Sequence, residues 1–140
     1  MDQTSENVLN IFKETALPGG TLVLGFSGWM DGGDVSTGTV ERLVELLAAH
    51  EIARIDGEPF YIYNFPGSME ITALFRPHVK IEDGQVESVQ MPANTFYCHR
   101  DGNLALFLGK EPNMHWRLYA GALFACAKAA GSRRVLFVGS

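Results

Sequence analysis

Thr21-Leu-Val-Leu-Gly-Phe26 is the stretch that decides the fold of this chain, and two later runs resemble it: Leu104-Ala-Leu-Phe-Leu108 and Val135-Leu-Phe-Val138. None of these runs alternates apolar with polar residues, which is typical of strands buried on both faces of a parallel sheet. Each run breaks at glycine, where the chain can turn off the sheet. The runs therefore predict the centre of a parallel sheet, with their following loops side by side at its carboxyl edge.

Helices are expected between these strands, because parallel strands require a crossover connection. From Asp34 onward apolar residues recur at the spacing of one helical face, and Asp34 or Ser36 is positioned to cap that helix. A second helix is expected from about Asn113 to Ala130, with Gly131 as its end. The sequence thus predicts an α/β fold with a mainly parallel central sheet.

The region 57–99 has a different character and is expected to be an insertion. The Asp-Gly pair within Glu82-Asp-Gly-Gln85 lies between alternating segments, which predicts an antiparallel hairpin. Residues 95–99 are expected to form one more strand. The prolines of Asn64-Phe-Pro-Gly-Ser68 and Phe75-Arg-Pro77 predict turns or extended linkers.

The composition is that of one ordinary globular domain, with residues 1–19 as an N-terminal extension. The chain has 140 residues, of which 46% are hydrophobic and 19% charged. Eleven Lys and Arg against sixteen Asp and Glu give a net charge of -5, the wrong sign for binding nucleic acid. The two cysteines and the absence of a leader or a membrane-length apolar run favour a cytoplasmic protein without a membrane anchor.

The first loop, Gly25-Phe-Ser-Gly-Trp-Met-Asp-Gly-Gly-Asp34, is the leading candidate site because it joins a buried strand to a helix N-terminus. It lacks the glycine spacing of a dinucleotide fingerprint, and Trp29 occupies the second glycine of the elbow that would present Ser27 as a nucleophile. Two interpretations stay open. Either the loop binds a ligand, or it is architectural, with Trp29 in the core and Asp31 capping a turn.

The second loop, Gly109-Lys-Glu-Pro-Asn-Met-His-Trp116, follows the next buried strand and would face the first loop if those strands are neighbours. Lys110 and Glu111 would then meet Asp31 beside the two tryptophans. Such a cluster suits a polar ligand or the tail of a partner. The alternative is a solvated ion pair beside the start of a helix.

No metal or cofactor is expected. The four histidines lack ligand spacing, and no phosphate-binding loop occurs. Cys98 and Cys126 are expected to be small buried hydrophobes. An aromatic cluster with one arginine occurs in the middle of the chain: Phe60, Tyr61, Tyr63, Phe65 and Arg76. We expect it either to form an association surface or to pack the hairpin against the sheet.

Three motifs occur in a specific order: Leu24-Gly-Phe-Ser-Gly-Trp-Met-Asp-Gly-Gly-Asp34, Phe75-Arg-Pro77, and Leu108-Gly-Lys-Glu-Pro-Asn113 followed by Trp116. Together they resemble the proteasome assembly chaperone family, named for the second chaperone of the eukaryotic pair. The candidate residues for binding a ligand or partner are Gly28, Trp29, Asp31, Gly32, Gly33, Asp34, Arg76, Lys110, Glu111 and Trp116.

The resemblance implies a three-layer α/β/α fold similar to nucleoside phosphorylases, of which this chain would be the N-terminal part. It also implies a homo-oligomer with proteasome-related partners, since the eukaryotic chaperones help assemble proteasome α-rings without catalysing a reaction. Bacterial and archaeal relatives are often labelled ATP-grasp carboxylate-amine ligases. This chain shows no nucleotide-binding motif of its own.

Two hypotheses of function follow. The first is a self-associating, protein-binding assembly factor. The second is a small-molecule enzyme, such as a carboxylate-amine ligase, a hydrolase or a phosphorylase-like transferase, that uses Ser27, Asp31, Lys110 and Glu111 at the sheet edge. An enzyme should gather these side chains around one cleft, whereas a binder should use them to satisfy loop ends and expose apolar surface elsewhere.

Overall fold

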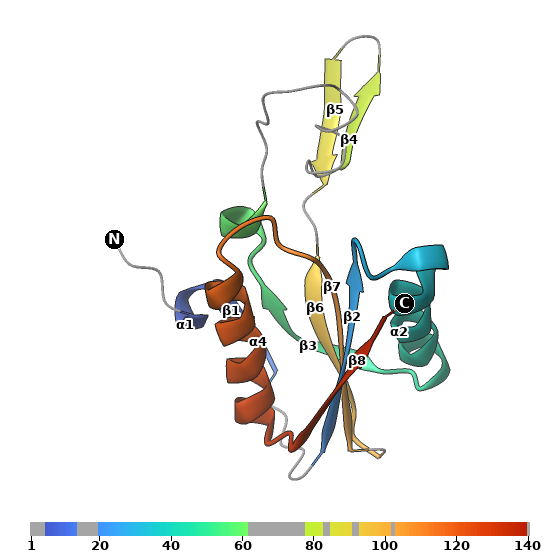
Figure 1. Cartoon of the computed structure of the whole chain (residues 1–140), viewed down its shortest axis with the longest axis vertical. Helices are drawn as coiled ribbons and strands as arrows, with labels where there is room; N and C mark the ends of the chain where they lie inside the picture. The colour runs from blue at the N-terminus through green and yellow to red at the C-terminus, as the bar shows by residue number, and fades with distance from the viewer. Residues whose placement is uncertain are drawn as a thin grey trace.

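The computed structural model describes residues 5–13, 20–61, 78–82, 85–90, 93–101 and 103–139. It is an α/β structure in which one mixed six-stranded sheet lies between helices (Figure 1). The helices are α1 (Ser5–Val8), α2 (Val35–Leu46) and α4 (Trp116–Ala130), with short 3-10 turns η1 (Gly32–Asp34) and η2 (Glu58–Phe60). The strands are β1 (Leu9–Ile11), β2 (Thr21–Ser27), β3 (His50–Ile55), β4 (His78–Glu82), β5 (Gln85–Gln90), β6 (Asn94–His99), β7 (Leu104–Lys110) and β8 (Arg134–Val138).

The strand order of the large sheet is β1-β3-β6-β7-β2-β8. Strand β2 pairs in parallel with β7 and with β8, so the three apolar runs form strands that share one direction, as predicted. The prediction that they form the centre of the sheet is wrong for β8, which is the outermost strand of the described sheet.

The prediction of a mainly parallel sheet is also wrong, because the pairs β1–β3, β3–β6 and β6–β7 are antiparallel. The physical reason is connection length. Only residues 100–103 join β6 to β7, and so short a link permits only antiparallel pairing. Apolar runs report burial on both faces of a sheet, not the direction of the neighbouring strand.

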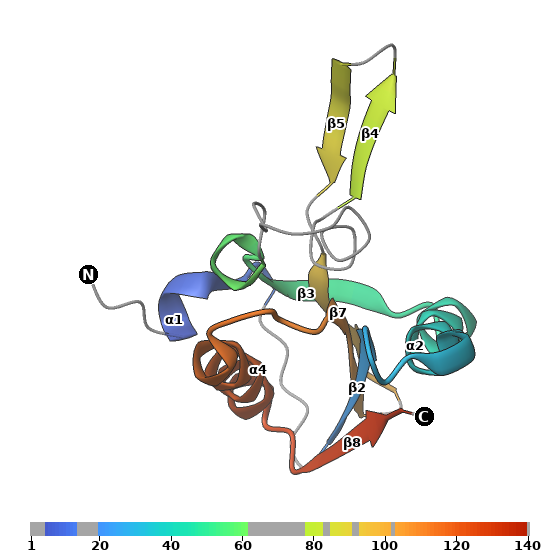
Figure 2. The same cartoon turned by 45° about the horizontal axis from the view of Figure 1, so that its top comes forward.

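The two long helices cover opposite faces of the sheet (Figure 2). On β2, Leu22 and Phe26 point into the larger core with α4, whereas Val23 points to the other face and packs near Val40 of α2. Helix α2 approaches β2 so closely that a Cβ on Gly25 would lie 2.5 Å from Cγ2 of Val40. The alternation along one strand therefore builds both cores.

Helix α4 begins at Trp116, three residues later than predicted. The N–H groups of Asn113 and Met114 donate to the carbonyl of Phe60 at 2.8 and 3.2 Å, and His115 adopts a left-handed conformation. Those bonds commit the preceding residues to a turn. The helix ends at Ala130 with Gly131 in the left-handed conformation, as predicted.

The predicted hairpin is present as a separate antiparallel pair of β4 and β5. The expected strand 95–99 lies within β6, whereas β3 was not predicted. Both α1 and β1 fall within the expected N-terminal extension, and Val8 contributes to the larger core. The expected turns at 64–68 and 75–77 lie outside the described residues. None of the described helices is both long and apolar enough to cross a membrane.

Candidate functional site

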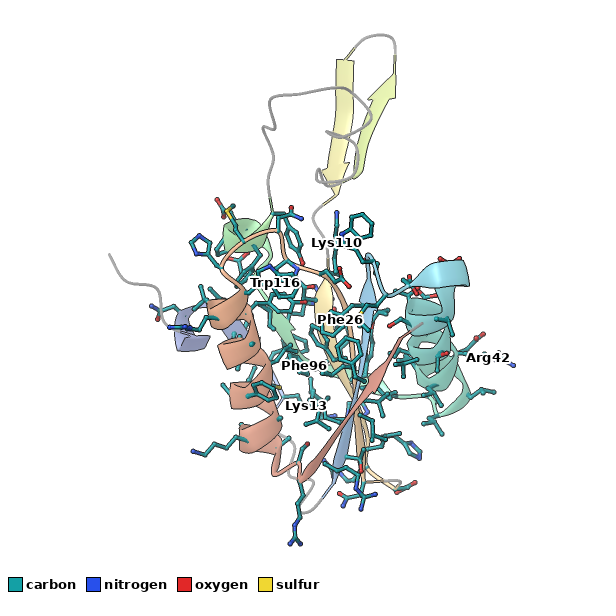
Figure 3. All side chains as sticks on the ribbon, in the orientation of Figure 1. Lys13, Phe26, Arg42, Phe96, Lys110 and Trp116 are labelled. Atoms are coloured by element: carbon teal, nitrogen blue, oxygen red, sulfur yellow. The ribbon has the colours of Figure 1, made fainter. Side chains whose placement is uncertain are left out.

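A pocket of about 410 Å³ lies where the loops after β2 and β7 meet. Because these strands are parallel neighbours with Ser27 opposite Lys110, both chains leave the sheet at the same edge. Figure 3 shows Lys110 and Trp116 at that end of the sheet. The pocket is lined by Ser27, Gly28, Trp29, Lys110, Glu111, Pro112, Asn113 and Trp116.

Glu111 ties the two loops together. Its N–H donates to the carbonyl of Ser27 at 3.0 Å, and its Oε2 accepts from the N–H of Trp29 at 3.1 Å. Gly28 has a φ of 139°, and a Cβ there would lie 2.5 Å from Oε2 of Glu111. Glycine at position 28 therefore provides both the backbone conformation and the space that the carboxylate needs.

Asp31 caps the start of α2, as the architectural interpretation expects. Its Oδ1 accepts from the N–H groups of Ser36 and Thr37 at 2.8 and 2.9 Å, and its Oδ2 accepts from the Thr37 hydroxyl at 2.7 Å. The prediction that Asp34 or Ser36 caps this helix is wrong. Asp34 has a φ of 57° and its side chain makes no capping hydrogen bond, so the cap comes from three residues earlier.

Asp31 does not line the pocket with Lys110 and Glu111, so the predicted cluster of three charges is not formed. The reason is that both of its carboxylate oxygens are bonded to the first turn of α2. Gly32, Gly33 and Asp34 form the exposed turn η1 and are likewise absent from the lining. Arg76, Tyr63 and Phe65 lie outside the described residues.

Both tryptophans of the pocket are exposed. Trp29 is 89% accessible and Trp116 is 57% accessible, so the expectation that Trp29 fills the core is wrong. Gly28 has a positive φ, and the N–H of Trp29 donates a hydrogen bond to the Glu111 carboxylate. Together these two features hold the backbone beside Trp29 at the surface. Two large aromatic faces thus border the pocket within reach of solvent.

A buried polar cluster holds the backbone of Lys110. Its N–H donates to Oδ1 of Asn94 at 3.0 Å, and its carbonyl accepts from the hydroxyls of Tyr61 and Tyr119 at 2.8 and 3.2 Å. Asn94 is only 1% exposed, and both hydroxyls also lie within hydrogen-bond distance of its Oδ1. These hydrogen bonds fix the position from which the Lys110 side chain extends.

The Lys110 ammonium lies 5.6 Å from the centroid of the Tyr61 ring. Burial lowers the pKa of Lys110 from its ordinary value, because desolvation disfavours the charged amine. Burial, followed by the nearby Tyr61, raises the pKa of Tyr119 well above its ordinary value. This cluster was not predicted from the sequence, although the polar Asn94 between apolar segments was a usable signal.

Ser36 was predicted as a possible helix cap, but its hydroxyl has a different role. Its Oγ accepts from the N–H of Phe26 at 2.8 Å and donates to the carbonyl of Val138 at 2.7 Å. The hydroxyl therefore joins β2, α2 and β8 at a buried point.

Cys98 and Cys126 are both buried, as expected. Burial raises the pKa of the Cys126 thiol to about 12, which keeps it protonated at neutral pH. Among the residues that the structure describes, no three His, Cys, Asp or Glu side chains gather in a way that could hold a metal ion.

Strand β8 carries a third feature, an exposed apolar surface. Val135, Leu136 and Phe137 are 42%, 49% and 49% accessible, so both faces of this strand reach solvent. We call these three residues the β8 patch. Large apolar side chains gathered on an outer strand are typical of an interaction surface.

Comparison with known protein families identifies the group to which this fold and these loops belong. The model of the PAC2 family matches residues 25–140, from the first loop through β8. The chain belongs to the PAC2 family. Residues 25–34 of the first motif and the whole of the third motif are described and lie within this match, and they belong to the two loops that meet at the pocket.

Several solved structures are similar to this chain. The proteasome-assembly chaperone homologue of Mycobacterium tuberculosis is 30% identical with a TM-score of 0.66, and the match covers 84% of this chain and 48% of that one. A PAC2 family protein from Streptomyces avermitilis is 25% identical with a TM-score of 0.61, at the same coverage. A Corynebacterium glutamicum protein of unknown function shares the fold, with 17% identity and a TM-score of 0.67 over 93% of this chain and 48% of that one.

The chain spans about half the length of these solved relatives. The ATP-grasp ligase label has no support among these matches. Comparison with curated proteins finds no significant match.

Proposed function

We propose that this PAC2 protein is a self-associating, protein-binding assembly factor rather than an enzyme. The observation that carries the proposal is the β8 patch on the outermost strand of the described sheet. An outer strand with apolar side chains on both faces favours pairing with another chain.

The candidate site residues support the same function. Asp31 caps α2 and Glu111 joins the two loops, so two of the four side chains proposed for catalysis satisfy loop ends. Exposed apolar surface lies elsewhere, on β8. This is the pattern expected of a binding protein, in which the shared motifs shape the loops.

The partners that we propose are a second copy of the chain and proteasome-related subunits, in the cytoplasm. Support for the second class comes from the Mycobacterium tuberculosis relative, which is described as a proteasome-assembly chaperone homologue. We further propose that the whole protein has the three-layer α/β/α fold of nucleoside phosphorylases. The placement of α2 and α4 on opposite faces of the sheet is consistent with that proposal (Figure 2).

Light scattering on the purified chain tests self-association. A mass that rises from one copy to two or more with concentration is expected, and Leu136→Glu should hold the chain at the mass of one copy. The control is Leu46→Glu, which places the same charge on another exposed leucine, in α2, that is 63% accessible against 49% for Leu136. A single-copy mass for the unaltered chain at all concentrations, or equal loss in both variants, would contradict the proposal.

A small-molecule enzyme is the second candidate, because Ser27, Lys110 and Glu111 do line one pocket. The lowered pKa of Lys110 is the feature that favours it, since catalytic lysines are tuned in this direction. Lys110→Met would then abolish any turnover found in a screen of carboxylates with amines and of nucleosides with phosphate. Turnover that persists in Lys110→Met would exclude this pocket as the catalytic site.

A further inference from the structure

The pocket contains one carboxylate, that of Glu111, which has no cationic partner among the described residues. Glu111 lines the pocket, and neither ion pair that the described residues form includes it. Its Oε2 accepts from the Trp29 N–H at 3.1 Å, while its Oε1 accepts no hydrogen bond from the described residues. Each carboxylate oxygen has two lone pairs, so both oxygens can still accept a hydrogen bond from a ligand.

Lys110 is the other charged residue of the lining, and its ammonium already has a partner. The ammonium lies 5.6 Å from the centroid of the Tyr61 ring, and Tyr61 is fully buried and does not line the pocket. This cation–π contact engages Lys110 with the interior, whereas the backbone bonds from Glu111 to Ser27 and from Trp29 to Glu111 hold the carboxylate in the pocket. The negative charge of Glu111 is therefore the one that a ligand meets unpaired.

Two exposed indoles line the same pocket as this carboxylate. Trp29 is 89% and Trp116 57% accessible, although both are large and apolar. Among aromatic side chains, indole attracts cations most strongly over its face. The Trp29 N–H also donates to the Glu111 carboxylate, so the fold places one of the indoles directly beside the negative charge. Aromatic faces beside an unpaired carboxylate favour an organic cation.

Among cations, the lining favours a guanidinium. A guanidinium is planar and weakly hydrated, it donates two parallel N–H bonds to one carboxylate, and it stacks on aromatic faces, whereas an ammonium is a strongly hydrated point charge. A metal ion is disfavoured, because no cluster of three metal-binding side chains occurs among the described residues. The volume of about 410 Å³ is at the small end of ordinary ligand pockets, which suits one long side chain. The net charge of -5 also favours a cationic partner.

We propose that this pocket binds an arginine side chain of a partner polypeptide. The guanidinium pairs with the Glu111 carboxylate and stacks against Trp29 or Trp116, the two residue types that are most enriched at the centres of protein interfaces being Trp and Arg with Tyr. The inference rests on the protein-binding function proposed above and adds a second surface to it. Self-association through the β8 patch uses other residues, so either surface can fail without the other.

Titration with N-acetyl-L-arginine amide tests the proposal, because this compound presents the side chain as it occurs within a polypeptide. Calorimetry and the fluorescence of the two tryptophans of the chain measure binding, and a Kd of about 1 mM or below is expected. The citrulline analogue has the same shape without the charge and should bind at least about tenfold more weakly. The lysine analogue keeps the charge without the planar group and should bind at least about threefold more weakly.

Two substitutions assign the contacts. Glu111→Gln keeps an oxygen for the Trp29 N–H but removes the charge, so the arginine and citrulline compounds should bind equally; Glu41→Gln, at an exposed position of α2 that does not line the pocket, is its control. Trp116→Leu should weaken binding of the arginine compound at least about threefold. Its control is Phe124→Leu, which changes an aromatic of α4 that is 56% accessible and does not line the pocket.

Four results would overturn the proposal. The first is no binding of the arginine compound by the unaltered chain. The second is equal binding of the arginine compound and either analogue. The third is unchanged binding in both Glu111→Gln and Trp116→Leu while their melting temperatures match that of the unaltered chain.

The fourth result concerns the source of the guanidinium. Free L-arginine that binds at least about tenfold more tightly than the blocked compound would assign the pocket to a free amino acid instead of a polypeptide. Leu136→Glu should leave binding of the arginine compound unchanged, and Glu111→Gln should leave the mass of the chain unchanged. These two measurements distinguish failure of this pocket from failure of the β8 patch.

Discussion

The two outer strands of the described sheet, β1 and β8, differ in length and in chemistry. Strand β1 has three residues, Leu9–Ile11, with the polar Asn10 at its centre. Strand β8 has five residues, and the three central ones are large, apolar and about half exposed. Short or polar outer strands are a common protection against unwanted pairing, whereas a longer apolar one invites it.

This difference teaches that the two edges of one sheet can differ in chemistry, and it is the basis for the proposal that the chain associates through β8 and not through β1. The β8 side is nevertheless firmly built, because the Ser36 hydroxyl bonds to the Val138 carbonyl and the rings of Phe26 and Phe137 stack with centroids 5.2 Å apart. The β8 patch is therefore held in place by contacts on its inner side. An ordered apolar strand costs less to bind than one that must first be ordered.

The largest expected effect comes from removing the aromatic contact between Phe26 in the core and Phe137 in the β8 patch. Phe26→Ala should lower the free energy of unfolding by about 3–5 kcal/mol, because Phe26 is buried against Phe107, Tyr119 and Phe137. Phe137→Ala should cost only about 1–2 kcal/mol, since half of that side chain is already exposed. Urea unfolding followed by circular dichroism measures both. Equal losses would mean that Phe137 is as much a core residue as Phe26.

The next effect concerns the close approach of α2 to the strand that supports β8. Gly25→Ala should destabilise by about 1–3 kcal/mol, because its Cβ would lie 2.5 Å from Cγ2 of Val40 and 2.8 Å from the Ser36 carbonyl. Gly38→Ala, within α2, meets only the Cβ of Asp34 at 3.9 Å and should stabilise by about 0.5–1 kcal/mol. The melting temperature should fall for Gly25→Ala and rise for Gly38→Ala. A destabilising Gly38→Ala would contradict the packing described.

A smaller effect is expected at the start of α2. Asp31→Ala should cost about 1 kcal/mol, because it removes the acceptor for the Ser36 and Thr37 N–H groups. Asp34→Ala should change stability little, since that side chain makes no capping bond. Chemical denaturation of both variants decides the matter. If Asp34→Ala cost more than Asp31→Ala, the cap would have been assigned to the wrong residue.

The smallest expected effect concerns Cys126. This residue lies in α4, away from both outer strands, and its side chain packs in the larger core. Its pKa of about 12 leaves almost no thiolate at pH 8, so alkylation by iodoacetamide should be far slower in the folded chain than in denaturant. Because folding raises this pKa above 9.0, the thiol favours the folded state less as pH rises above 9.0. Mass spectrometry of the Cys126 peptide measures the rate, and equal folded and unfolded rates would contradict its burial.

Sequence patterns predicted the elements of this fold better than their pairing. The apolar runs became β2, β7 and β8, and the periodic segments became α2 and α4. The direction of β6 and the presence of β3 were not predicted, because strand pairing depends on connections and partners far apart in the chain. Local sequence patterns indicate burial and helical or strand periodicity, but they hold little information on which strands pair with each other.

The candidate site was predicted in place but not in detail. The meeting of the two loops followed from the parallel pairing of neighbouring strands, and it brought Ser27, Lys110 and Glu111 to one pocket. The roles of Asp31 and Trp29 depended on φ angles and hydrogen bonds that residue types alone do not specify. The polar cluster around Asn94 joins Tyr61, which directly follows η2, to residues of β6 and α4, so no local window of sequence contains it.

Amide hydrogen exchange, measured on the chain at low and high concentration, compares the two outer strands most directly. If the β8 patch mediates association, the exchange of β8 amides should slow as concentration rises, while the amides of Asn10 and Ile11 in β1 exchange at an unchanged rate. Slowing confined to β1, or no change in β8 across a concentration range in which the mass increases, would contradict the central claim that β8 is the associating edge.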